Sequence, residues 1–136
     1  MTDKKPTRII DVMTPNPMRI DGLASVRDAL NMMKRAGMSS LVIDRRDEND
    51  EFGLITVRDI AHKVIGENRS IDRASVYEIM TKPVVTLEGR MLLKYAVRLL
   101  TRLNTGRALV LDQGELKGIV TLRDITLRYV TDEDAG

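Results

Sequence analysis

The strongest constraint on this chain is an internal repeat, because a sequence that contains the same segment twice folds into two copies of one structural unit. The segment GLITVRDI at 53–60 recurs 65 residues later as GIVTLRDI. Five of these eight positions are identical, and the other three exchange one aliphatic residue for another. Two shorter pairs, at offsets of 67 and 68, are DVMT at 11–14 with EIMT at 78–81 and LVID at 41–44 with LVLD at 109–112. The 136 residues therefore predict two homologous halves.

Each half has the pattern of one β-α-β-β-α unit. Short extended segments after a proline are expected at 18–20 and 84–87, and apolar residues at helical spacing follow each of them, at 26–36 and 93–103. Two aliphatic runs joined by a polar turn then predict a β-hairpin in each half, 41–43 with 52–57 and 109–111 with 116–121. A last helix starts near Arg58 and near Arg123. The predicted fold class is α/β, more strictly α+β, with two tandem repeats.

We assign the repeats to residues 9–66 and 75–131, with a polar linker at 66–74. A unit of about 60 residues buries too little surface to be stable alone. The two copies are therefore expected to pack on each other as one body with pseudo-twofold symmetry.

The composition excludes several classes of function. Cysteine is absent, which excludes disulfides, thiolate zinc sites and cysteine nucleophiles. A net charge of +2 and an aromatic content of 3% do not indicate a nucleic-acid binder. The apolar runs are too short for a membrane span or a signal peptide, so we expect a cytoplasmic protein without membrane contact. The one histidine, His62, aligns with Leu127, and no nucleophile–base pair has a recognised motif, so we expect no enzymatic activity.

The best chemical candidate is the motif Gly-apolar-apolar-Thr-apolar-Arg-Asp, where a strand turns into a helix. Thr56 with Asp59, and Thr121 with Asp124, have the spacing of a helix capping box, in which each side chain satisfies a free backbone N–H. The purely structural interpretation is therefore that both motifs only cap helices.

The same residues also suit a ligand. A helix N-terminus presents N–H groups and partial positive charge to a phosphate, and Arg58 or Arg123 adds further donors. A carboxylate would repel phosphate, but it accepts hydrogen bonds from the two neighbouring hydroxyls of a ribose. The cluster of Thr, Arg and Asp thus favours a nucleoside phosphate over a bare anion.

The sequence resembles tandem CBS (cystathionine-β-synthase-type) domain pairs over about residues 10–130. The resemblance rests on the DVMTP segment at 11–15, the repeat length, the order of elements and the Gly-x-x-Thr-x-x-Asp segment in both copies. It implies that these segments line clefts between the repeats. Many members of the family bind AMP, ADP, ATP or S-adenosylmethionine, with the Asp of the motif on the ribose hydroxyls.

The resemblance implies two ligand clefts, each built by one motif and by residues of the other repeat. The residues implied for the cleft of Asp124 are Thr14, Met18 and Ser39, beside Thr121 and Arg123 of the motif itself. Those implied for the cleft of Asp59 are Thr56, Arg58, Thr81, Val84 and Gly106. Arg107 stands where some members of the family place a phosphate-binding arginine, and Ser39 is taken as its counterpart in the first repeat. The two clefts are therefore expected to differ in affinity for phosphate.

The resemblance implies a regulatory module that senses AMP, ADP or ATP, with no catalytic cofactor and no metal site. Ligand would change the shape or association of the module, and an unknown partner protein would respond. Two alternatives stay open: a structural module that only dimerises, and a sensor of S-adenosylmethionine.

The helical faces predict a homodimer. The apolar arc of each long helix spans about 160°, whereas a helix packed on one side needs about 100°. The surplus apolar side chains are Met32, Leu92, Leu99, Leu127 and Val130. They would face water in a monomer unless they pack beneath linker residues such as Ile71, so a self-complementary interface is expected.

Overall fold

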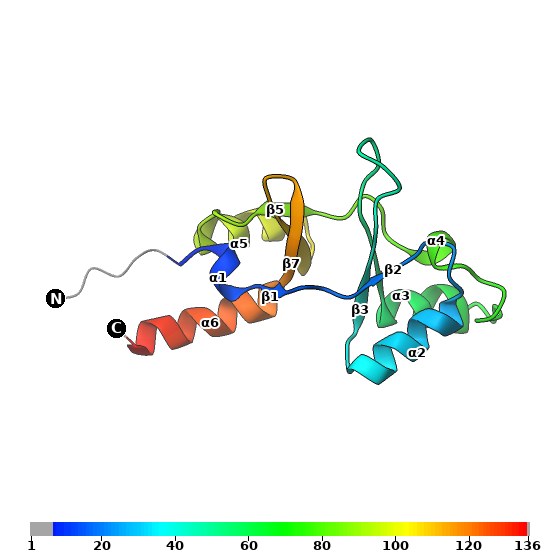
Figure 1. The fold of residues 1–136 in the computed structure, drawn as a ribbon. Coiled ribbons are helices and arrows are strands. Elements are labelled where there is room, and N and C mark those ends of the chain that lie inside the picture. The colour runs from blue at the N-terminus through cyan, green and yellow to red at the C-terminus, as the bar shows by residue number, and fades with distance from the viewer. Residues whose placement is uncertain (1–6, 136) are drawn as a thin grey trace. The chain divides into compact units, whose positions relative to one another are not determined.

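The structure, a computed structural model, describes the backbone of residues 7–135 and the side chains of residues 7–129. These residues form two compact units (Figure 1). The central unit runs from Met18 to Val84, and the terminal unit combines the residues up to Pro17 with those from Val85 onward. Each repeat therefore contributes its leading segment to the unit that holds the strands and helices of the other repeat. Among residues 7–135, no helix is long and apolar enough to cross a membrane.

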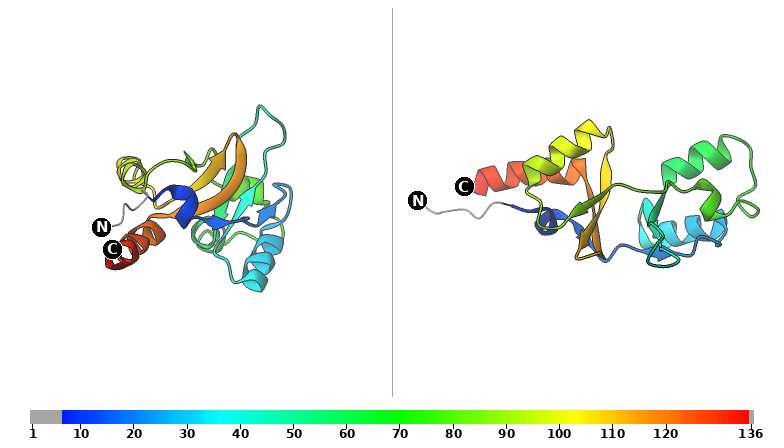
Figure 2. Two further views of the ribbon diagram at one scale, coloured as in Figure 1. Left: turned by 60° about the vertical axis from the view of Figure 1, so that its left-hand side comes forward. Right: turned by 90° about the horizontal axis from the view of Figure 1, so that it is seen from above.

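The central unit is a three-stranded sheet with α2 and α3 on the same side of it (Figures 1 and 2). Strand β3 lies in the middle, parallel to β2 and antiparallel to β4. In chain order the elements are β2 (Arg19–Ile20), α2 (Val26–Ala36), β3 (Ser40–Ile43), β4 (Gly53–Thr56), α3 (Val57–Ile60), the π-helical turn η1 (Ala61–Ile65) and α4 (Val76–Ile79).

The terminal unit is a four-stranded sheet in the order β1-β7-β6-β5, with α5 and α6 on one side of it (Figure 2). Its elements are α1 (Ile9–Val12), β1 (Thr14–Pro15), β5 (Thr86–Glu88), α5 (Leu93–Arg102), β6 (Arg107–Asp112), β7 (Glu115–Thr121) and α6 (Leu122–Ala135). The predicted α+β fold class and the β-α-β-β-α order of each repeat are confirmed, as β2-α2-β3-β4-α3 and β5-α5-β6-β7-α6.

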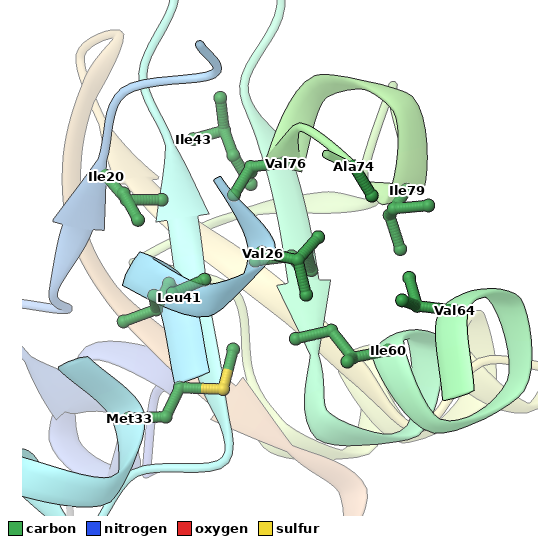
Figure 3. Close-up of a cluster of buried hydrophobic side chains, with 12 residues drawn as sticks. Ile20, Val26, Met33, Leu41, Ile43, Ile60, Val64, Ala74, Val76 and Ile79 are labelled. Atoms are coloured by element: carbon green, nitrogen blue, oxygen red, sulfur yellow. The ribbon is translucent and has the colours of Figure 1, made fainter. Parts of the chain in front are cut away.

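Helix α2 shows how the sequence sets an element and its buried face. The hydroxyl of Ser25 accepts the Asp28 N–H at 3.1 Å and caps the first turn, and Gly37 ends the helix in the left-handed region with φ of 67°. Between these caps, the buried side chains are spaced by three and four residues, Val26, Ala29 and Met33. They point into a core that is shared with the sheet, η1 and α4 (Figure 3).

The predicted linker is part of the central unit. The first N–H groups of a helix have no partner within the helix. In α2 the N–H of Val26 donates to the Ala74 carbonyl and that of Arg27 to the Ile71 carbonyl, both at 2.9 Å. Ile71 also packs against the central core. The segment 66–74 therefore fixes the start of α2 as well as joining the repeats.

The glycine that opens each motif is required by a close approach of chain segments. A Cβ on Gly53 would lie 2.7 Å from the Met80 sulfur. A Cβ on Gly118 would lie 2.5 Å from the Met13 sulfur and 2.6 Å from the Thr14 carbonyl oxygen. In both units, the leading segment of the other repeat passes directly over the strand that carries the motif.

The surplus apolar residues are less exposed than predicted. Met32 packs partly against the central core and Leu99 against the terminal core, and Leu92 is half-buried at the start of α5. Met32 and Leu99 therefore face water only in part, because each packs against the core of its own unit. Leu127 is 50% exposed, and the side chain of Val130 lies outside the described residues.

Candidate functional site

In the central unit the motif forms a complete capping box. Strand β4 ends at Thr56, and α3 begins at the next residue. The N–H of Asp59 donates to the Thr56 hydroxyl, and the N–H of Thr56 donates to Oδ2 of Asp59, both at 3.0 Å. The capping interpretation is confirmed for this copy.

A lysine from the following turn approaches the other oxygen of the same carboxylate. Nζ of Lys63 lies 3.9 Å from Oδ1 of Asp59. The same ammonium donates to the Ile79 carbonyl oxygen at 3.1 Å, at the end of α4. Both oxygens of Asp59 therefore face a donor of the protein itself, and only 20% of the Asp59 side chain is exposed.

In the terminal unit only half of the capping box is present. The N–H of Asp124 donates to the Thr121 hydroxyl at 3.0 Å. No N–H from Thr121 reaches the Asp124 carboxylate within the described part of the chain, and the nearest cation is Nη1 of Arg123 at 3.7 Å. The Asp124 side chain is 42% exposed. Its carboxylate is therefore open to hydrogen bonds from outside the protein.

The strands on either side of β7 bring two further predicted residues close to this motif. Arg107 on β6 pairs with Thr121. Thr14 on β1 pairs with Ile119, two residues before Thr121. We call Thr14, Arg107, Thr121, Arg123 and Asp124 the terminal half-site.

In the central unit, the strand position opposite the motif threonine holds a serine in place of an arginine. Ser40 on β3 pairs with Thr56, and the backbone of Thr81 exchanges hydrogen bonds with Leu54 on β4. We call Ser40, Thr56, Arg58, Asp59 and Thr81 the central half-site.

This strand pairing corrects a predicted correspondence. Because Ser40 pairs with Thr56 as Arg107 pairs with Thr121, the counterpart of Arg107 is Ser40, and the assignment of Ser39 was wrong. The matching letters LVID and LVLD lie one residue out of register between the two hairpins. A shift of one residue turns each side chain to the opposite face of a sheet, so the error changes which residues share a face.

Backbone hydrogen bonds place Ser39 and Gly106 as equivalents. The Ser39 carbonyl accepts the Val57 N–H at 3.0 Å, and the Gly106 carbonyl accepts the Leu122 N–H at 2.8 Å. Each of these two residues precedes a hairpin strand and holds the first N–H of the helix after the motif.

Sequence reasoning missed Val85. The Met18 carbonyl accepts the Val42 N–H, and the Val85 carbonyl accepts the Leu109 N–H, both at 2.9 Å. Val85, and not Val84, therefore corresponds to Met18. The constant spacing from Thr14 to Met18 and from Thr81 to Val85 is the signal that identifies it.

Each predicted cleft set is divided between the two units. Of the set predicted for the cleft of Asp124, Thr14, Thr121 and Arg123 lie with it in the terminal unit, whereas Met18 and Ser39 belong to the central unit. Arg107, which was predicted without a cleft, lies in the terminal unit. With Asp59 in the central unit lie Thr56, Arg58, Thr81 and Val84, whereas Gly106 belongs to the terminal unit.

A second charged contact fixes the segment before Val84. Nζ of Lys82 lies 2.7 Å from Oδ1 of Asp50, and the Arg46 N–H donates to the other oxygen at 2.9 Å. The hydrogen bond from Lys82, followed by that from the Arg46 backbone, holds the pKa of Asp50 well below its usual range. The contact ties the β3–β4 loop to the segment after α4. Within the described residues, no group of three or more His, Cys, Asp or Glu side chains could hold a metal ion.

Comparison with protein families decides the identity of the fold. The model of the CBS domain matches the chain twice, at residues 9–66 and 76–131. The chain belongs to the CBS domain family. It is a CBS pair, because both copies of the domain lie in one chain.

Relatives of this CBS pair include proteins of archaea and bacteria. An uncharacterized protein of Methanopyrus kandleri is 34% identical over 85% of this chain. The matched segment covers 56% of the length of that protein. The CBS domain-containing protein YhcV of Bacillus subtilis is 26% identical over 93% of this chain and 88% of its own length.

Two solved structures show the same fold. The hexameric CBS-CP12 protein from bloom-forming cyanobacteria has a TM-score of 0.86 and 32% identity, and the match covers 92% of this chain and 69% of that one. The CBS domain pair of protein MJ0100, in complex with 5′-methylthioadenosine and S-adenosyl-L-methionine, has a TM-score of 0.78 and 25% identity, covering 94% of this chain and 99% of that one.

Proposed function

We propose that this CBS pair is a regulatory module that binds an adenosine nucleotide and passes its occupancy to a partner protein. The observation that carries the proposal is the open carboxylate of Asp124, which lies beside Thr121 and Arg123, with Arg107 opposite Thr121 on the neighbouring strand. The CBS pair of protein MJ0100 binds two adenosine compounds, which supports the adenosine part of the ligand.

Each group of the terminal half-site has a defined task in this proposal. The Asp124 carboxylate accepts hydrogen bonds from the two ribose hydroxyls, and charged hydrogen bonds of this kind are the strong ones. The Thr121 hydroxyl and the guanidinium groups of Arg107 and Arg123 face the phosphate. A guanidinium presents several N–H donors in a plane that matches phosphate oxygens.

The charge of the half-site favours AMP, ADP or ATP over S-adenosylmethionine. Arg123 lies 3.7 Å from the Asp124 carboxylate, and Arg107 adds a second cation on the neighbouring strand, opposite Thr121. A nucleotide brings negative phosphates to these cations, whereas S-adenosylmethionine brings a positive sulfonium. The proposal requires no catalytic step, and it places the module in the cytoplasm, where adenine nucleotides are abundant.

Thermal unfolding with and without ligand tests the proposal. Ligand at about 100 times its dissociation constant stabilises a folded protein by about 2.7 kcal/mol, which raises the unfolding temperature by several degrees. We expect this rise with AMP, ADP or ATP and a smaller one with S-adenosylmethionine. The Asp124→Ala variant serves as the control and should show at most about half of this rise at the same ligand concentration. No shift with any of these compounds at millimolar concentration would favour the alternative of a purely structural module.

We also propose that the module is a homodimer joined through the helices of its terminal unit. Tyr95 and Leu103 on or just after α5, and Tyr129 on α6, are 49%, 50% and 63% exposed. Apolar surface of this kind is stabilised when a second copy covers it. The hexameric state of the related CBS-CP12 protein shows that a similar chain assembles with itself.

A further inference from the structure

The carboxylate of the motif makes different contacts in the two copies. A ribose offers two neighbouring hydroxyls, and a carboxylate receives both most strongly when each oxygen is unshared. At Asp59, Oδ2 already accepts the Thr56 N–H at 3.0 Å, and Oδ1 faces the Lys63 ammonium at 3.9 Å. A ribose at this position would have to share or displace both contacts.

Lys63 is itself fixed by a contact outside the motif. Its ammonium donates to the Ile79 carbonyl at 3.1 Å, at the end of α4. Lys63 lies in η1, where the Gly66 N–H reaches back five residues to the Ala61 carbonyl at 2.7 Å. Such π-helical turns are rare and are often found at functional sites. Lys63 therefore joins the motif helix to α4, with Asp59 as its second partner.

The terminal unit has a different contact at the corresponding place. Four residues after Asp124 stands Arg128, and its guanidinium donates to the Asp11 carbonyl at 3.4 Å. Helix α6 continues as an α-helix through this region. Among the side chains of residues 7–129, the Asp124 carboxylate has only that of Arg123 beside it, and this side chain is itself 78% exposed.

The strands add a second difference that also favours ligand binding in the terminal unit. Opposite the motif threonine stands Arg107 in the terminal unit and Ser40 in the central unit. A serine offers one hydroxyl to a phosphate, whereas an arginine offers a charged pair of donors.

We infer that each chain binds one adenosine ligand, at Asp124, and that Lys63 holds Asp59 in a structural role. This inference rests on the proposed adenosine-binding function and deepens it. Both repeats contain the motif, but the contacts of the central copy connect α3 and η1 with α4. Lys63 is thus a positioning residue that, together with the Thr56 N–H, occupies the carboxylate of the central motif.

Calorimetric titration with AMP, together with thermal unfolding without ligand, tests the inference. The wild-type chain should bind one equivalent of AMP. Asp124→Ala should weaken binding by about 10- to 150-fold, the loss expected for a charged hydrogen bond, and leave the ligand-free unfolding temperature almost unchanged. Asp59→Ala should lower that temperature by several degrees and leave the AMP affinity within about twofold.

Two further variants keep the test decisive. Asp59→Asn retains an acceptor oxygen for the Thr56 N–H, so it stays folded if the alanine variant does not, and its AMP affinity should equal that of the wild type. Lys63→Met retains the apolar stem and removes the ammonium. It should lower the ligand-free unfolding temperature without changing the AMP affinity, whereas weaker binding would show that Lys63 contacts the phosphate and would overturn the inference.

The outcomes separate the inference from the function beneath it. Binding of two equivalents of AMP, or equal losses of affinity in Asp59→Asn and Asp124→Ala, would overturn the single-site inference and leave the proposed function standing. Absence of binding by the wild type to AMP, ADP and ATP at millimolar concentration would overturn the proposed function. In that case the ligand-free unfolding temperatures still decide whether Asp59 is structural.

Discussion

Asp50 is a residue whose ionised form the folded chain stabilises. Its carboxylate contacts Lys82 at 2.7 Å and the Arg46 N–H at 2.9 Å, and the side chains of the ion pair are only 21% and 13% exposed. By contrast, Arg19 and Asp44 form an ion pair at the same distance with about half of each side chain exposed, where solvent weakens the attraction.

The lowered pKa of Asp50 predicts a stability that depends on pH. A carboxylate whose pKa is lower in the folded state stabilises the fold above its unfolded pKa, about 3.9, and this contribution is lost as the pH falls toward the folded pKa. The free energy of unfolding of Asp50→Asn should therefore be lower than that of the wild type at pH 7, and the difference should shrink below about pH 4. Urea unfolding over this range measures it.

Asp44→Asn is the matched control for this prediction. Its partner Arg19 is exposed, so the variant should differ little from the wild type at any pH. A difference between Asp50→Asn and the wild type that stayed constant down to about pH 2 would contradict the assigned role of Lys82.

Contacts within one helical turn of the site could be predicted from the sequence, whereas contacts between distant residues could not. The spacing of Thr56 and Asp59 predicted the capping box correctly, because both partners lie within one turn. The contact of Lys63 with Asp59 depends on the π-helical turn and on the Ile79 carbonyl, 16 residues away in the chain. Nothing in the local pattern shows that turn, so the difference between the two motifs could not be predicted.

At the scale of elements, the long helices were predictable and the strand register was not. The apolar spacing and Gly37 define α2, because both follow from the geometry of one helix. The register of β6 against β7 contains an irregularity between Val110 and Leu111. The misalignment of LVID with LVLD does not depend on this irregularity, because Ile43 pairs with Gly53 and Val110 with Gly118 before it. Matching letters carry no information on strand register, so they were aligned one residue out of step.

The packing of β1 on β7 predicts a strong effect of a small substitution. In Gly118→Ala the new Cβ would meet the Thr14 carbonyl at 2.6 Å, a backbone atom that cannot turn away. Overpacking of this kind costs about 1–3 kcal/mol. We expect a lower unfolding temperature than for the wild type, measured by circular dichroism.

Gly106→Ala is the control for this substitution, since a Cβ there would meet no atom within 4 Å. It should leave the unfolding temperature nearly unchanged. Equal stability of the Gly118 and Gly106 variants would contradict the close approach of the leading segment to β7.

At the scale of the whole molecule, the proposed homodimer is tested on its exposed apolar residues. Leu99 packs partly against the terminal core, so its replacement would disturb folding and association together. Leu103 is 50% exposed and suits the test better. Light scattering at tens of micromolar should give a dimeric mass for the wild type and a smaller mass for Leu103→Glu.

Thr101→Glu adds the same charge to an exposed polar position of α5 and serves as the control. It should keep the dimeric mass if the interface is centred on the apolar residues. A monomeric wild type, or a dimer that persists in Leu103→Glu, would count against an interface at this end of α5.

The packing of the two repeats into one pseudo-twofold body stays a prediction, as does the pairing of residues across the repeats at each ligand site. Both belong to the central claim that the CBS pair holds an adenosine nucleotide at Asp124. The most direct test is a crystal structure grown with millimolar AMP. We expect AMP with both ribose hydroxyls on the Asp124 carboxylate and its phosphate at Arg107. An empty site there, or AMP with its ribose on Asp59, would contradict this claim.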